Sequence, residues 1–184
     1  PHVCRVFDVG EDGKHTFITM EIIEGVTLET AAMREPFSEE RSIATLIQVC
    51  EALEAAHREN VVHRDLKPSN IMVSDTGHVT VMDFGLARDL SVEASASTHG
   101  GAVGTPAYWA PEQARGEAAT YQSDVFSVGL IAYRLLVGDV RAPFPTGEQL
   151  AKLKAPYGRI VKRCLEPDAK NRFGSVSALR EVLE

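Results

Sequence analysis

The chain has 184 residues, of which 44% are hydrophobic and 24% are charged, as in an ordinary globular domain. Its 26 acidic and 19 basic residues give a net charge of −7, which argues against the broad basic face of a nucleic-acid-binding protein. The longest apolar run, residues 125–138, is interrupted by Arg134 and is too short to span a bilayer.

The chain opens with two stretches rich in β-branched and aromatic residues, 3–9 and 16–23. The turn residues between them, at 10–13, predict a hairpin. Because the sequence starts with Pro1 inside a strand-like pattern, we expect it to be a piece of a longer chain.

The first long helix is expected to follow Ser38, which can cap it, with Glu39 and Glu40 in a first turn where the helix dipole favours acids. Asn60 tolerates left-handed backbone geometry and is expected to end this helix. Apolar residues recur along it at a spacing that buries one face: Ile43, Leu46, Ile47, Cys50 and Leu53.

A second hairpin is predicted from residues 71–73 and 79–82, with Gly77 supplying the positive φ of the turn between them. The small, polar residues 83–104 that follow predict a long mobile loop.

The last third of the chain is expected to be helical. Ser123 can cap a helix over residues 124–137 that is apolar nearly all round, which is typical of a helix at the centre of a core. Gly138 ends it. Shorter helices are predicted over residues 148–155, 157–165 and 175–183, so the fold class is α+β, mostly helical with short β-hairpins.

The chemistry concentrates in "VVHRDLKPSNIMV", residues 61–73. Asp65 could accept a proton from a hydroxyl, and Lys67 could neutralise charge on a transferring group. Asn70 and Asp83 offer oxygen ligands of the kind that Mg²⁺ takes from proteins. Together these groups suit phosphoryl transfer.

Taken singly, each of these residues could be a solvated loop polar. The set of seven positions is different, because chance would give it with a probability on the order of 10⁻⁶. The seven are His63, Arg64, Asp65, Asn70, Asp83, Phe84 and Gly85.

Five motifs in the same order resemble those of eukaryotic-type protein kinases, and their wording is close to that of bacterial serine/threonine kinases. They are "HRDLKPSN", "DFG", "GTPAYWAPEQ", "SDVFSVG" and the Arg of "PDAKNRF". The resemblance implies a protein-kinase-like fold in which the whole chain, 1–184, is a partial kinase domain with a truncated small lobe. Residues 1–23 would be the remnant of small-lobe strands and hinge, and 24–184 the large helical lobe.

The resemblance also implies roles for single residues. Asp65 would be the catalytic base, Lys67 would steady the γ-phosphate, and Thr105 would hydrogen-bond Asp65. Asn70 and Asp83 would bind Mg²⁺. The expected ATP-binding residues are Met20, Glu21, Ile23, Lys67, Ser69, Asn70, Met72 and Asp83; without the resemblance, Met20 and Met72 would be interpreted as ordinary core.

Four residues are expected to have structural roles. His63 and Asp124 would support the catalytic loop and the start of the central helix. Glu112 and Arg172 would form a largely buried ion pair that ties the docking loop, 104–113, to the late helices.

The implied function is transfer of the γ-phosphoryl group of ATP to serine or threonine of a protein substrate, with Mg²⁺. Lys67 and Thr105 favour serine/threonine over tyrosine specificity. The alternative is a catalytically inactive kinase-like binding or scaffold module, because the sequence contains no glycine-rich ATP lid and no strand lysine. A small-molecule phosphotransferase is disfavoured by the docking loop.

Control by phosphorylation is also expected. Arg64 would receive a phosphate from the loop, with Thr98 the first choice of site and Ser97 the second. A second copy of the kinase, in a homodimer, is the expected source of that phosphate.

The three cysteines, at positions 4, 50 and 164, are far apart in the sequence. We interpret them as reduced core thiols of a cytosolic-type protein. We therefore expect a cytoplasmic location, either of a whole protein or of the cytoplasmic part of a longer membrane protein.

Overall fold

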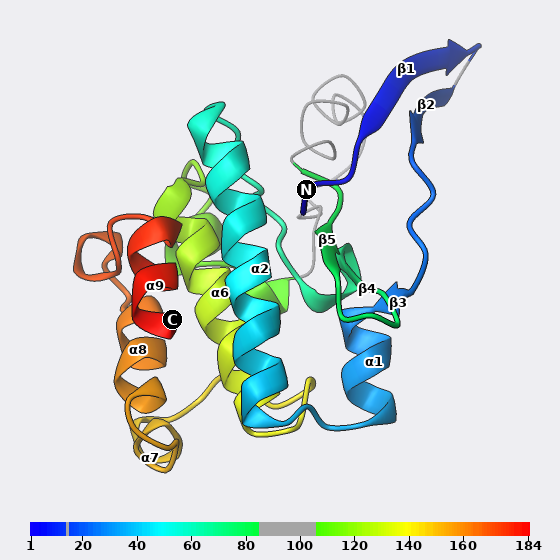
Figure 1. Ribbon diagram of the computed structural model, residues 1–184. Helices are drawn as coiled ribbons and strands as arrows, with labels where there is room; N and C mark the ends of the chain where they lie inside the picture. Colours follow the sequence, from blue (N-terminus) through cyan, green and yellow to red (C-terminus); the bar gives the residue numbers. More distant parts are fainter. Residues whose placement is uncertain (14, 85–105) are drawn as a thin grey trace.

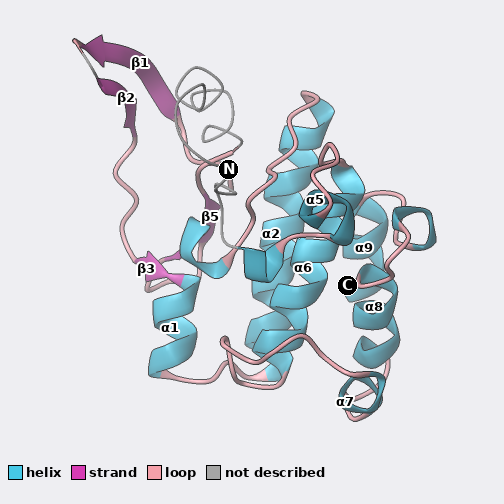
Figure 2. Ribbon diagram, turned by 180° about the vertical axis from the view of Figure 1, so that it is seen from behind, coloured by secondary structure: helices cyan, strands magenta, loops and turns pink. Residues whose placement is uncertain are grey.

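The computed structural model of the protein describes residues 1–13, 15–84 and 106–184. Small antiparallel sheets precede and flank a body of helices (Figures 1 and 2), so the predicted α+β class is confirmed. The first half of the chain contains β1 (Val6–Asp12), β2 (His15–Met20), β3 (Val26–Thr27), α1 (Leu28–Arg34), α2 (Glu39–Arg58), β4 (Ile71–Val73) and β5 (Val79–Val81). The second half contains α5 (Pro111–Ala114), α6 (Tyr121–Leu136), α7 (Gly147–Ala151), α8 (Tyr157–Cys164) and α9 (Val176–Leu183), with short 3₁₀ turns at Pro68–Asn70, Pro106–Tyr108 and Ala169–Asn171.

Helix α2 forms where the sequence predicts it. The Ser38 hydroxyl accepts a hydrogen bond from the backbone N–H of Arg41 at 3.2 Å, and the chain leaves the helix through Asn60, at φ 61°. Its buried stripe packs against α6 and α9 (Figure 1).

Helix α6 lies at the centre of the core, as predicted, but it begins one turn earlier than expected. Thr120 is the N-cap, and its backbone N–H donates to the Ser123 hydroxyl at 2.9 Å. Ser123 therefore belongs to the first turn and is not the cap. Every residue from Ser123 to Leu135 is buried, because α2, α8 and α9 cover the helix on several sides.

The short strands form two separate sheets. β1 and β2 make a hairpin, as predicted, but residues 10–12 of the expected turn belong to β1 and pair with β2. The hairpin extends away from the helices and leaves Phe7 62% exposed (Figure 1). β3, β4 and β5 form the second sheet, in that order. The first residues of the chain reach this sheet, since the Cys4 N–H donates to the carbonyl of Val81 at 2.9 Å.

Helix α1 was not predicted from the sequence. Thr27 caps it by accepting a hydrogen bond from the Thr30 N–H at 3.2 Å, and Leu28, its first residue, is fully buried. The helix is only seven residues long, so it gives little periodic signal. The predicted helix at 148–155 is also shorter, because α7 ends at Ala151.

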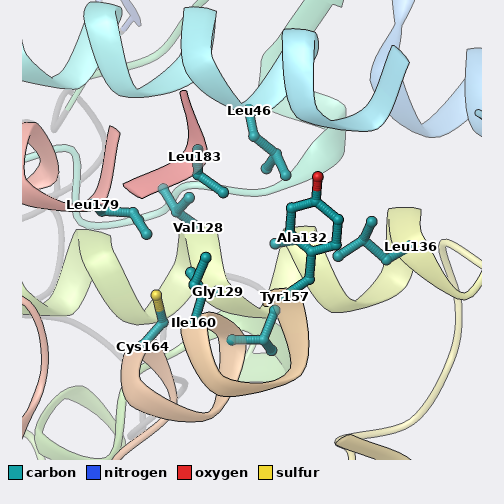
Figure 3. A pocket seen from close by; sticks show the side chains of 11 residues that line it. Leu46, Val128, Gly129, Ala132, Leu136, Tyr157, Ile160, Cys164, Leu179 and Leu183 are labelled. Atoms are coloured by element: carbon teal, nitrogen blue, oxygen red, sulfur yellow. The ribbon is translucent and has the colours of Figure 1, made fainter. Parts of the chain in front are cut away.

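The late helices pack closely on α6. Gly129 faces Cys164 of α8, and a Cβ added to this glycine would lie less than 3.0 Å from the Cys164 Cβ. Figure 3 shows the small apolar pocket at this contact, lined by side chains from α2, α6, α8 and α9. Burial raises the pKa of the Cys50 thiol to about 12 and also raises that of Cys164, so both behave as inert core residues.

The predicted ion pair between Glu112 and Arg172 is present and buried. Two guanidinium nitrogens of Arg172 bond the two carboxylate oxygens of Glu112 at 2.7 and 2.8 Å, and the Ser123 hydroxyl donates to Glu112 at 2.7 Å. Arg172 also donates to the carbonyls of Gln122, Glu166 and Pro167. The pair therefore joins α5, the start of α6 and the segment before α9.

No helix in the described ranges is long and apolar enough to cross a membrane.

Replacing Gly129 with Ala should lower stability by about 1–3 kcal/mol, because the new methyl group overpacks the α6–α8 contact. Gly147→Ala is the matched control, since a Cβ there meets no atom within 4 Å. Urea unfolding of both variants measures the difference. Equal stability of the two would show that α6 and α8 are not in close contact at Gly129.

Glu112→Ala should lower the free energy of unfolding by about 3–5 kcal/mol, because it leaves the Arg172 charge buried without its partner. The exposed ion pair of Arg115 with Glu117 supplies the control, Glu117→Ala, which should change the melting temperature little.

The stability that the Glu112–Arg172 ion pair contributes to the fold should also depend on pH. Burial would raise the pKa of Glu112, but the hydrogen bonds from Arg172, from the backbone and from Ser123, together with the charge of Arg172, outweigh it and lower the pKa to about 2, from an ordinary value of 4.5. The stability difference between wild type and Glu112→Ala should be full above pH 4.5 and should shrink as the pH falls toward 2. A difference that stays constant across this range would contradict the assignment.

Candidate active site

The catalytic loop, residues 63–70, runs from the end of α2 to β4 and is fixed by a carboxylate from the centre of the core. One oxygen of Asp124, in the first turn of α6, accepts the backbone N–H of His63 at 2.9 Å, and the other accepts that of Arg64 at 3.1 Å. Asp124 is 1% exposed. The loop backbone is therefore bonded directly to the most buried helix of the fold.

Arg64 adopts an unusual backbone conformation. Its φ is 71°, in the left-handed region that residues with a side chain rarely occupy. Such a conformation persists only where the surroundings hold it, and residues of this kind cluster at functional sites. It turns the chain at the residue directly before Asp65.

His63 supports the loop by packing, as predicted. Its ring is fully buried and packs against Phe84, with the two rings tilted and their centroids 4.7 Å apart. Burial lowers the pKa of His63, so the neutral form is favoured. In that form Nε2–H donates to the carbonyl of Met82 at 2.9 Å, and Nδ1 accepts the N–H of Asp65 at 3.4 Å.

The two residues predicted to act on the reacting groups lie in contact. The Lys67 ammonium is 2.6 Å from Oδ2 of Asp65. The other oxygen, Oδ1, is buried, and no donor among the described residues bonds it. Asn70 completes this arrangement from the far end of the loop, because its side-chain nitrogen donates to the carbonyl of Asp65 at 3.1 Å.

The β4–β5 hairpin brings the two expected metal ligands together. Asn70 directly precedes β4, and Asp83 follows β5 after Met82. The Met82 N–H donates to the carbonyl of Asn70 at 2.9 Å, so the two ends of the hairpin are adjacent. Asp83 is exposed, at φ 59°. An amide oxygen and an exposed carboxylate are a donor set that fits Mg²⁺, which takes few protein ligands.

The expected nucleotide-binding residues lie in several elements in and around this hairpin. Met72 is in β4, and Ser69 is in the 3₁₀ turn that precedes it. Met20 ends β2 and lines a pocket that Asp83 and Phe84 also line.

Glu21 and Ile23 belong to the connection between β2 and β3. The Glu21 backbone is held by Arg5, whose carbonyl accepts its N–H at 3.0 Å. Its neighbour Ile22 is 95% exposed. Thr105 and the expected regulatory residues Ser97 and Thr98 lie outside the described residues, as does most of the predicted loop at 83–104.

Sequence reasoning missed His57. Its Nε2 lies 2.7 Å from Oδ2 of Asp124, and its ring packs 4.4 Å from that of Tyr121. The Tyr121 hydroxyl in turn donates to the side chain of Asn60 at 3.2 Å. His57 continues the buried spacing of Cys50 and Leu53, and a histidine on a buried face needs a polar partner. That signal could have identified it.

The comparisons with known proteins agree with this geometry. The family model described as a protein kinase domain matches residues 1–183. The chain is 35% identical to the serine/threonine-protein kinase PknB of Mycobacterium tuberculosis over 205 aligned residues, which cover 100% of this chain and 33% of that protein. It is 46% identical to the serine/threonine-protein kinase PknL of the same organism over 159 residues, covering 86% of this chain and 38% of PknL.

A third relative, PknB of Mycolicibacterium smegmatis, is 34% identical over 205 residues, which cover 100% of this chain and 33% of that protein. The chain thus spans between 33% and 38% of the length of these relatives. Family membership rests on the match along nearly the whole chain. The chain belongs to the protein kinase domain family.

Proposed function

We propose that this domain transfers the γ-phosphoryl group of ATP to serine or threonine hydroxyls of a protein, with Mg²⁺ as the metal. The observation that carries the proposal is the contact of Asp65 with Lys67 on a loop held by Asp124, next to the adjoining ends of the β4–β5 hairpin. The relatives are named serine/threonine-protein kinases, which supports the same reaction and substrate class.

Asp65 would act as the general base. Its Oδ1 is buried without a donor among the described residues, so it is available to accept the proton of a substrate hydroxyl. As that proton moves to Asp65, the hydroxyl oxygen bonds the γ-phosphorus and the bond to the bridging oxygen of ADP breaks. The bond from Asn70 to the Asp65 carbonyl keeps the carboxylate in place.

Lys67 would stabilise the transferring group. Its ammonium is held 2.6 Å from Asp65, so its charge lies beside the point where the γ-phosphoryl passes. A cation placed there in advance stabilises developing negative charge without reorganisation.

Asn70 and Asp83 would hold Mg²⁺, and Met20, Glu21, Ile23 and Met72 would lie against the adenine. When bound, the metal supplies positive charge that neutralises the phosphate oxygens. The choice of Mg²⁺ among divalent metals rests on the all-oxygen donor set.

Substrate, location and control form the rest of the proposal. Asp65 and Lys67 suit a hydroxyl substrate on a protein, and the buried reduced thiols suit a cytoplasmic setting. Phosphorylation at Thr98 or Ser97 by a second copy, read by Arg64, stays a prediction.

Asp65→Asn in the full-length protein should lower the turnover of phosphotransfer by about 10²–10⁴-fold, because the amide cannot accept the proton. The fold should be retained, since the amide keeps the size of the side chain. Incorporation of ³²P from ATP into a serine/threonine peptide library measures the effect.

Asp75→Asn is the matched control, because Asp75 is exposed in the turn of the neighbouring β4–β5 hairpin. It should have wild-type turnover. Turnover of Asp65→Asn equal to that of this control would remove Asp65 from the chemistry. A wild-type protein without any transfer would instead favour the inactive binding module.

A further inference from the structure

We propose that Gln113 is a positioning residue that couples the docking helix α5 to the catalytic loop. This inference rests on the proposed phosphotransfer activity, and it assigns a role to Gln113, the last residue of "GTPAYWAPEQ", which has no role in the proposed chemistry above. The side-chain amide of Gln113 bonds backbone groups in two segments, the catalytic loop and the start of α5.

Gln113 uses both ends of its amide. Its Nε2 donates to the carbonyl of Arg64 at 2.7 Å, and its Oε1 accepts the N–H of Ala110 at 3.2 Å. The first bond crosses 49 positions in the sequence to reach the catalytic loop. The second fixes the side chain at the start of α5, so the amide spans from the docking segment to the loop.

The carbonyl that Gln113 holds belongs to the peptide unit that joins Arg64 to Asp65. A peptide unit is planar, so the direction of its C=O also sets the direction of the Asp65 N–H and the place of the Asp65 Cα. The N–H end of this unit has only a long bond, 3.4 Å to the ring of His63. The bond from Gln113, at 2.7 Å, is shorter and is therefore the stronger restraint on the orientation of this peptide unit.

Arg64 also has a strained backbone conformation. Arg64 is at φ 71°, with its N–H bonded to Asp124 and its carbonyl bonded to Gln113. A left-handed conformation persists only where the surroundings hold it, and here hydrogen bonds hold both the N–H and the carbonyl of Arg64. Loss of the Gln113 bond would remove the hold on the carbonyl side of Arg64, while its N–H would stay bonded to Asp124.

Helix α5 does not depend on Gln113 to stay in place. The neighbouring Glu112 is anchored by the buried pair with Arg172 and by the Ser123 hydroxyl. A change at Gln113 should therefore release the peptide before Asp65 while α5 remains docked. A loop that loosens while α5 stays docked would indicate that Gln113 positions the loop, whereas a purely structural role would loosen α5 itself.

Only a side chain with both a donor and an acceptor at this reach satisfies the two bonds. In Gln113→Glu, a carboxylate oxygen would face the Arg64 carbonyl, and the two acceptors would repel. In Gln113→Met, the length is kept and both bonds are lost without a new charge.

The test measures peptide phosphorylation by the full-length protein carrying Gln113→Glu or Gln113→Met. The matched control is Gln48→Glu, because Gln48 also donates to a carbonyl, that of Gly77, and accepts a backbone N–H, that of Val79, both at 3.0 Å. We expect kcat to fall about tenfold or more in both Gln113 variants, with the KM for ATP near the control value, since a small misplacement of a catalytic group is costly.

Hydrogen exchange of residues 64–70 gives a readout that needs no phosphotransfer. It should be faster in the Gln113 variants than in Gln48→Glu, with protection of α6 unchanged. A kcat within twofold of the control, or faster exchange confined to 107–114, would overturn the coupling and leave Gln113 as a helix cap. If the wild type transfers no phosphate, the proposed function fails, and the exchange data alone decide the coupling.

Discussion

The buried carboxylate of Asp124 is the interaction on which the rest of the site depends. It accepts the backbone N–H groups of His63 and Arg64 and also contacts the ring of His57. Its position in the first turn of α6 favours a negative charge there, and its donors offset the cost of burying it. Because α6 is covered on several sides by other helices, the catalytic loop is attached to a buried part of the core.

The same turn of α6 also holds the docking segment. Ser123, directly before Asp124, donates to Glu112, whose other partner is Arg172 near α9. Two consecutive residues thus fix two separate segments, the loop that carries Asp65 and the docking segment that carries Glu112. The bond from Gln113 to Arg64 joins these segments directly, so Asp65, α5 and the core form one connected arrangement.

Much of this could be predicted from the sequence, because the decisive residues are local or ordered in motifs. The ends and turns of several elements follow from the local preferences of single residues: Ser38 caps α2, and Asn60 and Gly77 adopt the positive φ of a helix end and a turn. The pairing of Glu112 with Arg172 follows from the family pattern. The start of α6 could not be placed, because Thr120 and Ser123 are both good caps and their mutual hydrogen bond decides between them. Helix α1 was too short for periodicity, and His57 and Gln113 act across 67 and 49 positions, which only the fold brings together.

The most direct test of this account is hydrogen exchange at the backbone amides of His63 and Arg64 in Asp124→Asn, measured with turnover in the full-length protein. An amide at position 124 keeps one acceptor oxygen and turns a donor toward a backbone N–H. The account predicts much faster exchange at these two amides and a loss of phosphotransfer, with the protection of α2 retained. Unchanged exchange at residues 63 and 64 together with wild-type turnover would contradict it.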